Sequence, residues 1–294
     1  MMNKLITKLL EHGPVITDGA WGTELIKRGL QKGECPERLN LKHPERVAEI
    51  PALYVEAGSQ VVLTNTFGGN RYILEKHNLA DKVREINAAG VEISKEAAED
   101  KALVFASIGP SGKMIVMKQV TAEELEEAFT EQAEAIADAG ADAIVIETMI
   151  DIEEALAAIR AAKKTGLPVV ASMVFDSGKN MDRTMMGNTP EEVAEKFEAA
   201  GVDALGSNCG KGIEGFIPIC RRMRAVTDLP LWMKANAGMP EIVKGETVYN
   251  VTPDQFASRV PELIEAGANF IGGCCGTNPD FIKAVRAKIQ QKLS

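Results

Sequence analysis

Three cysteines lie where their thiols could bind a metal ion. Cys274 and Cys275 are adjacent within the glycine-rich segment 270–277. Neighbouring side chains of an extended chain point to opposite sides, so both thiols can face one point only where the backbone twists, and flanking glycines permit that twist. Cys209 follows the apolar segment 204–208 in an equivalent place. The spacing leaves four interpretations open: a soft-metal site, a buried cysteine pair, a vicinal disulfide and a glycine-rich phosphate loop.

The histidines give no support to other kinds of catalytic centre. His12, His43 and His77 fall in segments expected to be helices or loops. A histidine metal site, a Ser-His-Asp triad and a Cys-His nucleophile are therefore disfavoured. Thiolates favour zinc, and a catalytic zinc ion typically has three protein ligands and one open position. Three cysteines match that pattern better than a closed structural site, which needs a fourth ligand.

Two carboxylates could recognise an ammonium group near these thiols. Asp18 begins the glycine-flanked turn 18–23, and the simplest interpretation is that it caps a helix. Alternatively, backbone N–H groups of this turn bind a ligand carboxylate while Asp18 lies near an ammonium group. Glu147 ends another apolar segment and is the second candidate. Two carboxylates facing a metal favour an amino-acid ligand over a solvated carboxylate.

Short apolar segments alternate with longer amphipathic ones along the chain, which indicates strands alternating with helices. The expected strands are 15–18, 61–66, 103–108, 143–148, 169–175, 204–209, 231–236 and 270–274. The expected helices are 44–57, 81–100, 121–139, 152–164, 190–200, 213–226 and 253–266. This count predicts an α/β protein, a (β/α)8 TIM barrel in which residues 1–294 form one domain. A doubly wound open sheet is the rival, but no G-x-G-x-x-G follows the first strand.

The barrel prediction has a functional consequence, because chemistry in such barrels lies at the carboxyl ends of the strands. The candidate residues all fall at those ends, so their side chains can converge on one mouth. They are Asp18, Glu147, Cys209, Asn236, Cys274 and Cys275. The remaining cysteines, Cys35 and Cys220, fall in a loop and in a helix, where we expect an incidental thiol and a core residue.

The composition restricts the classes of partner and compartment. A net charge of -9 and a pI near 5.1 argue against a nucleic-acid groove, and no run of basic residues suggests an anionic membrane surface. No apolar run approaches the ~18 residues of a membrane span. The first ten residues predict an amphipathic helix rather than a secretory signal. Five cysteines fit a reducing compartment, so we expect a cytoplasmic protein.

Together these residues resemble the homocysteine S-methyltransferase family, and within it the homocysteine-binding barrel of cobalamin-dependent methionine synthases. The resemblance runs nearly end to end and in order, and the double cysteine with an upstream Asn-Cys is its most specific part. The matching motifs are Asp18-Gly19-Ala20-x-Gly22-Thr23, Thr64-Asn65-Thr66-Phe67, Glu147-Thr148, Asn208-Cys209, Asn236-Ala237-Gly238-x-Pro240 and Gly272-Gly273-Cys274-Cys275-Gly276-Thr277.

The resemblance implies a zinc enzyme that methylates homocysteine to methionine. It implies zinc on Cys209, Cys274 and Cys275, with the homocysteine sulfur in the open position. The homocysteine amino group would lie near Glu147 and Asp18, and its carboxylate would bind backbone amides around Ala20. Asn236 would lie beside the metal and could fill the fourth position when substrate is absent.

The sequence indicates the methyl donor less directly than the acceptor. The likeness ends with the barrel, and no folate-, cobalamin- or adenosylmethionine-binding module follows residue 294, so we expect the donor to arrive separately, on a methylcorrinoid protein. Segment 185–188 offers no aromatic cage for betaine. An open, shallow mouth is expected from the small loop residues Gly68, Gly69, Gly112 and Gly238. The alternatives are S-methylmethionine or betaine as donor, another thiol as acceptor, and a non-catalytic zinc-binding subunit of a methyl-transfer complex.

Overall fold

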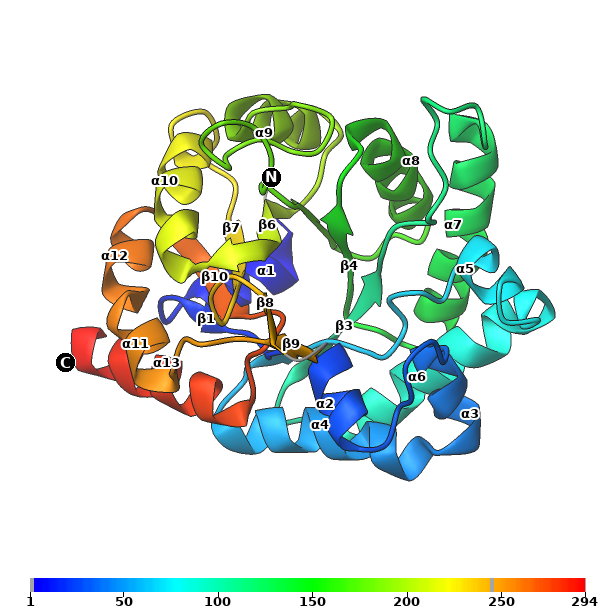
Figure 1. Ribbon diagram of the computed structural model, residues 1–294, viewed down its shortest axis with the longest axis horizontal. Coiled ribbons are helices and arrows are strands. Elements are labelled where there is room, and N and C mark those ends of the chain that lie inside the picture. The colour runs from blue at the N-terminus through cyan, green and yellow to red at the C-terminus, as the bar shows by residue number, and fades with distance from the viewer. Residues whose placement is uncertain (1–2, 244–245, 294) are drawn as a thin grey trace.

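The computed structural model describes residues 3–243 and 246–293. Eight parallel strands form its centre, and they are β1 (Val15–Ile16), β2 (Val61–Val62), β3 (Leu103–Ile108), β4 (Ala143–Met149), β5 (Val169–Met173), β6 (Ala204–Gly212), β7 (Leu231–Asn236) and β10 (Ala268–Gly273). Their order is β1-β10-β7-β6-β5-β4-β3-β2, and a parallel bridge between Thr17 and Val61 joins the two outer strands. The sheet therefore closes into a barrel, which confirms the predicted (β/α)8 fold (Figure 1).

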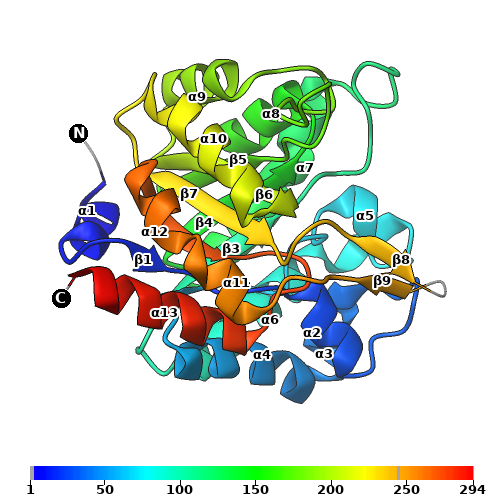
Figure 2. The same ribbon diagram turned by 60° about the vertical axis from the view of Figure 1, so that its left-hand side comes forward.

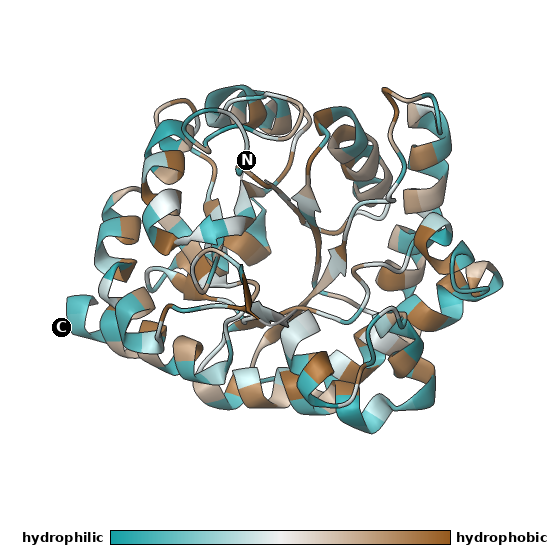
Figure 3. Ribbon diagram, in the orientation of Figure 1, coloured by the Kyte–Doolittle hydropathy of each residue, from teal (hydrophilic) through white to brown (hydrophobic). Residues whose placement is uncertain are grey.

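Helices surround the barrel and connect its strands (Figure 1). The longer ones are α4 (Pro44–Ala57), α6 (Val83–Ala98), α7 (Ala122–Asp138), α8 (Ile152–Lys163), α9 (Pro190–Ala199), α10 (Ile213–Arg224) and α13 (Pro279–Leu293). The shorter ones are α1 (Lys4–Leu10), α2 (Gly22–Lys27), η1 (Pro36–Arg38), α3 (Leu39–Lys42), α5 (Arg71–Glu75), η2 (Ala80–Lys82), α11 (Pro253–Ser258) and α12 (Val260–Glu265). The strands are largely hydrophobic, whereas the helices carry both kinds of residue around their circumference (Figure 3).

One helix predicted from the sequence is two helices in the structure. The segment expected to be helical over 253–266 divides at Arg259 into α11 and α12, and Pro261 lies in the first turn of α12. Proline has no N–H to continue the hydrogen bonds of the preceding helix and disfavours helical geometry in the residue before it. The hydrophobic period continues across this break, and a proline alone does not predict one, because Pro51 and Pro218 lie inside the continuous helices α4 and α10.

The interior of the barrel is filled at its amino-terminal end. Phe105, Trp232 and Phe270 pack together there, with ring centroids 6.2 Å apart for Phe105 and Trp232 and 5.3 Å apart for Trp232 and Phe270. Ile6 of α1 belongs to the same buried cluster, so this helix covers the lower end of the barrel. The space available for chemistry therefore lies at the carboxyl end, above Trp232.

A short hairpin stands at that carboxyl end and was not predicted from the sequence. It consists of β8 (Glu241–Val243) and β9 (Glu246–Val248), which pair antiparallel directly after β7. Figure 2 shows it projecting from the end of the barrel opposite α1. Strands of three residues are too short to give a recognisable alternation. In the described part of the chain, no helix has the length and apolar character needed to cross a membrane.

Candidate metal and substrate site

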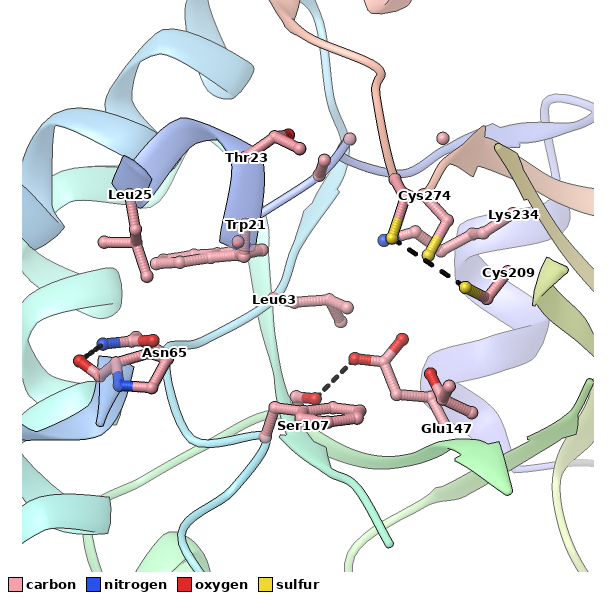
Figure 4. Close-up of a pocket in the computed structure, with 18 of the residues that line it drawn as sticks. Trp21, Thr23, Leu25, Leu63, Asn65, Ser107, Glu147, Cys209, Lys234 and Cys274 are labelled. Carbon is pink, nitrogen blue, oxygen red and sulfur yellow. Dashed lines mark hydrogen bonds between the residues drawn. The ribbon is translucent and has the colours of Figure 1, made fainter. Parts of the chain in front are cut away.

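The three cysteines from the two strand ends meet at the mouth of the barrel. Cys209 lies near the end of β6, and Cys274 and Cys275 follow β10, so they flank the end of β7 on both sides. Their sulfur atoms all lie within 4.8 Å of one another, and the Sγ atoms of Cys209 and Cys275 are 3.8 Å apart. All are free thiols, so the vicinal disulfide is not formed in this structure (Figure 4).

Unusual backbone geometry turns these side chains toward one another. Cys209 has a positive φ of 63°, and the pairing of β6 with β7 is irregular between Asn208 and Gly212. A non-glycine residue in the left-handed region carries a conformational cost and often marks a functional site. Of the glycines around the cysteine pair, only Gly276 has a positive φ; a Cβ at Gly273 would instead clash with the Thr277 hydroxyl. The glycines therefore provide room as well as a twist.

The three thiols share hydrogen bonds that separate their proton affinities. Hydrogen bonds with Cys274 and then Cys275 lower the pKa of the Cys209 thiol. The reciprocal interaction with Cys209 is the main cause that raises the pKa of Cys274 and of Cys275. The cluster on its own thus favours one thiolate, and only a bound cation would favour three. Thiolate sulfur is a preferred ligand type for zinc.

Asn236 offers an oxygen atom beside this cluster. It ends β7, and its Nδ2 atom donates a hydrogen bond of 3.1 Å to the Gly210 carbonyl. Its Oδ1 atom is buried and has no hydrogen-bond partner among the described residues. A hydrogen bond with Asn236 also contributes to the lowered pKa of Cys209. Three thiols and one unpartnered carboxamide oxygen form a donor set that suits a four-coordinate zinc ion.

A cavity of about 240 Å³ opens in front of the cysteines. One wall is the loop after β1 and the start of α2, and another is formed by the ends of β3, β4 and β7. Figure 4 shows the side chains that surround it. Its lining includes Gly19, Ala20, Trp21, Gly22, Thr23, Leu63, Phe67, Ser107, Glu147, Thr148, Lys234 and the three cysteines.

Glu147 lies in this cavity as the sequence predicted. Its side chain is 8 % exposed, and one carboxylate oxygen accepts a hydrogen bond of 2.5 Å from the Ser107 hydroxyl. Burial raises the pKa of Glu147, and Lys234 and the Ser107 hydrogen bond only partly oppose this effect. A buried carboxylate with few donors is a favourable site for a ligand ammonium group.

Asp18 is not positioned as the sequence suggested. It is fully buried and is absent from the cavity lining. Its carboxylate accepts hydrogen bonds from the ammonium of Lys234, from Trp21 Nε1 at 2.9 Å and from the Leu63 N–H at 2.8 Å. The ammonium group that Asp18 contacts therefore belongs to the protein. Lys234 was not identified from the sequence, although its alternation with Asn236 along β7 places both on one face of the strand.

Ala20 lines the cavity, but its own backbone groups are occupied. Its N–H donates to the Thr277 hydroxyl at 3.1 Å, and its carbonyl accepts from the Tyr54 hydroxyl at 2.8 Å. The available groups lie slightly further along, because among the described residues no acceptor is found for the N–H of Gly22 or Thr23. The buried Thr23 hydroxyl also has no partner there. These groups, rather than the Ala20 amide, could bind a ligand carboxylate.

The cysteines outside the motif take no part in the site. Cys35 is buried before η1, and its thiol lies 3.2 Å from a carboxylate oxygen of Glu37. Cys220 is buried within α10. Burial raises the pKa of each of these thiols to about 12. Tyr249, which follows the hairpin, was missed: a hydrogen bond with its side chain slightly counters the raised pKa of Cys275.

The loop glycines expected to leave the mouth open instead pack closely against neighbours. A Cβ atom at Gly69 would clash with Asn87, and one at Gly238 would lie 2.7 Å from the side chain of Val251. Equivalent atoms at Gly68 and Gly112 would lie 3.0 and 2.8 Å from neighbouring side chains. The small size of these glycines therefore allows tight packing of the loops, and the open mouth stays a prediction.

Comparison with known proteins identifies the relatives of this chain. Residues 15–289 match the family described as homocysteine S-methyltransferase. The methionine synthases of Mycobacterium leprae and Mycobacterium tuberculosis are each 31% identical to it, over 97% and 96% of this chain. The chain spans only a quarter of their length, 25% in both cases.

Solved structures agree with the barrel fold. The metallated form of the homocysteine methyltransferase MmuM from Escherichia coli has a TM-score of 0.82 at 24% identity, and the alignment covers 97% of this chain and 100% of that one. Its apo form has a TM-score of 0.76 at the same identity, covering 96% and 99% of the two chains.

Proposed function

The chain belongs to the homocysteine S-methyltransferase family, and from this premise we propose that it methylates homocysteine to methionine on a zinc ion held by Cys209, Cys274 and Cys275. One observation carries the proposal: three free thiols from two strand ends lie within 4.8 Å of one another, in the wall of a cavity that also contains a buried carboxylate. Zinc bound there would hold a substrate thiol as its thiolate at neutral pH, which is the nucleophilic form.

The residues of the chain would bind and orient the acceptor. Glu147 binds the ammonium group of homocysteine. The lining of the described cavity contains two carboxylates, Glu37 and Glu147, and Glu147 is the one that faces the cysteines. The N–H groups of Gly22 and Thr23 bind the substrate carboxylate at the opposite wall. Asn236 places its unpartnered Oδ1 atom beside the three cysteines, where the substrate sulfur would lie. Fixing both ends of the amino acid directs its sulfur toward the incoming methyl group.

The reaction transfers one methyl group and needs no oxidant. The homocysteine thiol loses its proton when it binds, and a lone pair of its sulfur attacks the methyl carbon of the donor. A sulfur–carbon bond forms, the bond between that carbon and the donor breaks, and its electron pair stays with the donor. We propose a methylcorrinoid carried by a partner protein as the donor.

Exposed apolar side chains around the mouth support a protein-borne donor. With the exception of Leu53, the large hydrophobic residues exposed in the described structure lie on segments that follow barrel strands. They are Ile26, Phe67, Val116, Met117, Met181, Met185, Met186, Met239, Ile242 and Val243. Exposed apolar patches often mark protein interaction sites, and methionine side chains adapt well to a transient partner.

A small cationic donor is the competing candidate, and one feature favours it. Trp21 and Phe67 line the cavity, and aromatic faces attract sulfonium and quaternary ammonium groups. S-Methylmethionine and betaine belong to this class.

The decisive experiment offers zinc-loaded protein and homocysteine four donors in parallel: methylcobalamin, a methylated corrinoid protein, S-methylmethionine and betaine. We expect methionine from the corrinoid donors. Turnover with a small donor alone would overturn the donor assignment, and turnover of a different thiol in place of homocysteine would overturn the acceptor assignment. No methionine with any donor would favour a non-catalytic zinc-binding subunit.

A further inference from the structure

A second cavity adjoins η1 and is separate from the one in front of the cysteines. It has a volume of about 180 Å³ and lies among the turn after α2, the helices η1 and α3, and the start of α4. Figures 1 and 2 both show α2 and α3 beside α4 at this place. η1 contributes Glu37 to the first cavity and Arg38 to the second, and the two linings share no residue.

Three cationic side chains line this second cavity. They are Arg38, Lys42 and Arg46, which recur four residues apart in the sequence. Among the described residues of the lining, Glu34 is the only carboxylate, and it is exposed and accepts a hydrogen bond of 2.8 Å from the N–H of Gln31. The lining therefore has an excess of positive charge, although the net charge of the chain is -9.

The cations of this cavity lack close carboxylate partners. Lys42 forms no ion pair within the described part of the chain, and Arg46 has only the preceding glutamate, at 3.9 Å. The neighbouring Arg28 differs, because Glu24 lies 2.8 Å and Glu49 2.9 Å from its guanidinium. The nearby carboxylates thus neutralise Arg28 and leave the second cavity positive.

Arg38 also has hydrogen-bonding capacity that the protein does not use. Its Nη2 atom donates to the His77 carbonyl at 3.0 Å, but its Nε atom is buried and has no partner among the described residues. A buried donor without an acceptor is unfavourable, and a guanidinium group can donate to two oxygens of one anion. The cavity lies at the amino-terminal end of α4, where His43 gives the helix no side-chain cap and the helix dipole favours negative charge.

We propose that the second cavity binds a phosphoryl dianion, either free phosphate or a small phosphate monoester. The oxygens of one tetrahedral phosphoryl group can accept hydrogen bonds from three cationic side chains, whereas a single carboxylate has two oxygens and one charge. A dianion would also neutralise the excess positive charge of the lining. This site does not depend on the proposed methyl transfer, since it involves neither the cysteines nor the cavity in front of them.

Calorimetric titration of the zinc-loaded protein at pH 8 tests the proposal, because the phosphoryl group is a dianion there. The probes are inorganic phosphate and glycerol 2-phosphate, and we expect at least one to bind with a Kd of about 1 mM or tighter. The tighter probe shows whether the ligand is free phosphate or an ester. Succinate, a dicarboxylate, should bind at least about tenfold more weakly than that probe. Weaker binding of both phosphate probes, or a smaller difference from succinate, would overturn the proposal.

A double variant locates the bound anion. Lys42 and Arg46 are exposed or half-exposed and make few internal contacts, so Lys42→Gln/Arg46→Gln should fold and bind phosphate at least about tenfold more weakly. The matched control is Arg71→Gln/Arg84→Gln, which removes the same two charges from another hollow, where Arg71 pairs with Glu131 at 2.8 Å. Its phosphate affinity should equal that of wild type. Unchanged binding in the first variant, or an equal loss in the control, would overturn the proposal.

Two further variants decide the outcome if the double variant does not fold. Arg38→Lys keeps the charge but removes the buried Nε–H donor, so phosphate should bind at least about threefold more weakly. Cys209→Ala should bind phosphate as wild type does. Unchanged binding in Arg38→Lys, or loss of binding in Cys209→Ala, would overturn the proposal, because the anion would then lie elsewhere, in the second case at the cysteines.

Discussion

The site has two corners that differ in how they are built. The cysteine corner, at the ends of β6 and β10, brings together three thiols whose sulfur atoms all lie within 4.8 Å of one another. The carboxylate corner, formed by β1, β4 and β7, combines Asp18, Glu147 and Lys234 in a buried charge network. The thiols of the first corner are free and can bind a ligand that comes from solution. The second satisfies the charge of Asp18 internally through Lys234, and only Glu147 of its two carboxylates lines the cavity.

This difference predicts different consequences of mutation. Removing a residue from the cysteine corner should abolish ligand binding there, because nothing else in the corner can replace it. Removing a residue from the carboxylate corner should change selectivity and stability by amounts that depend on the partner left behind.

The largest effect is expected for the cysteines. Purified protein should contain about one zinc ion, and Cys209→Ala or Cys275→Ala should lose it, because a two-thiol site binds zinc far more weakly. Methyl transfer should then fall by at least about a hundredfold. Metal analysis and a methionine assay measure both. Cys220→Ala, a buried cysteine of α10, is the control that should keep its zinc. Full zinc retention in either mouth variant would contradict the metal assignment.

Thiol labelling of the metal-free protein should show that the two cysteines outside the motif are protected. Burial raises the pKa of Cys35 and of Cys220 to about 12, so at pH 8 their thiolate fraction is about a thousandfold below that of an ordinary thiol. We expect iodoacetamide to leave both unmodified in folded protein and to modify them after unfolding. Mass spectrometry of digested protein gives the site and rate. Rapid labelling of Cys220 without unfolding would show that the helix layer opens locally.

The cysteine corner could be predicted from sequence because its signal is local. Two short motifs carry the cysteines, and the strand count alone places both at the barrel mouth. The carboxylate corner could be predicted only in part, because its key contact joins residues 216 positions apart in the sequence. A single lysine in an apolar strand gives no indication of its partner, yet the ammonium group of Lys234 contacts one carboxylate oxygen of Asp18. The packing of the loop glycines depends in the same way on contacts that periodicity does not contain, whereas the break at Arg259 accompanies Pro261, which the sequence does show.

We expect Glu147→Gln to bind homocysteine more weakly and to be more stable than wild type above the pH range in which Glu147 titrates. It removes one charge-assisted contact, worth roughly 1.5–3 kcal/mol, or about ten- to a hundredfold in homocysteine affinity. Zinc content should be unchanged. Calorimetric titration with homocysteine measures the loss, and unchanged affinity would place the amino-group site elsewhere.

The stability effect of the same variant has a definite sign. Burial raises the pKa of Glu147, so the folded state holds its proton more tightly than the unfolded state. The stability conferred by this group is therefore fully present at low pH, and it is lost as the pH rises from the usual glutamate value through the raised one. Above that window Glu147→Gln should melt at a higher temperature than wild type in the absence of ligand, and below it the two should converge. A variant that melts lower than wild type at pH 8 would contradict this account.

The smallest effect is expected at the opposite wall, where Thr23 tests whether an unpartnered group waits for the substrate. Its buried hydroxyl has no acceptor or donor among the described residues, and it lines the cavity beside the free amides of α2. Thr23→Val keeps the shape and removes the hydroxyl, so the free protein should be as stable as wild type or slightly more stable. If the hydroxyl binds the homocysteine carboxylate, the contact is charge-assisted, and affinity should fall by about tenfold, the lower end of the range for such a hydrogen bond. Ser94 has an equally unpartnered buried hydroxyl in α6, away from the cavity, and Ser94→Ala should leave affinity unchanged. Equal affinities of Thr23→Val and wild type would restrict carboxylate binding to the backbone N–H groups. This wall could then be predicted from the turn 18–23, just as the cysteine corner could be predicted from its own short motifs.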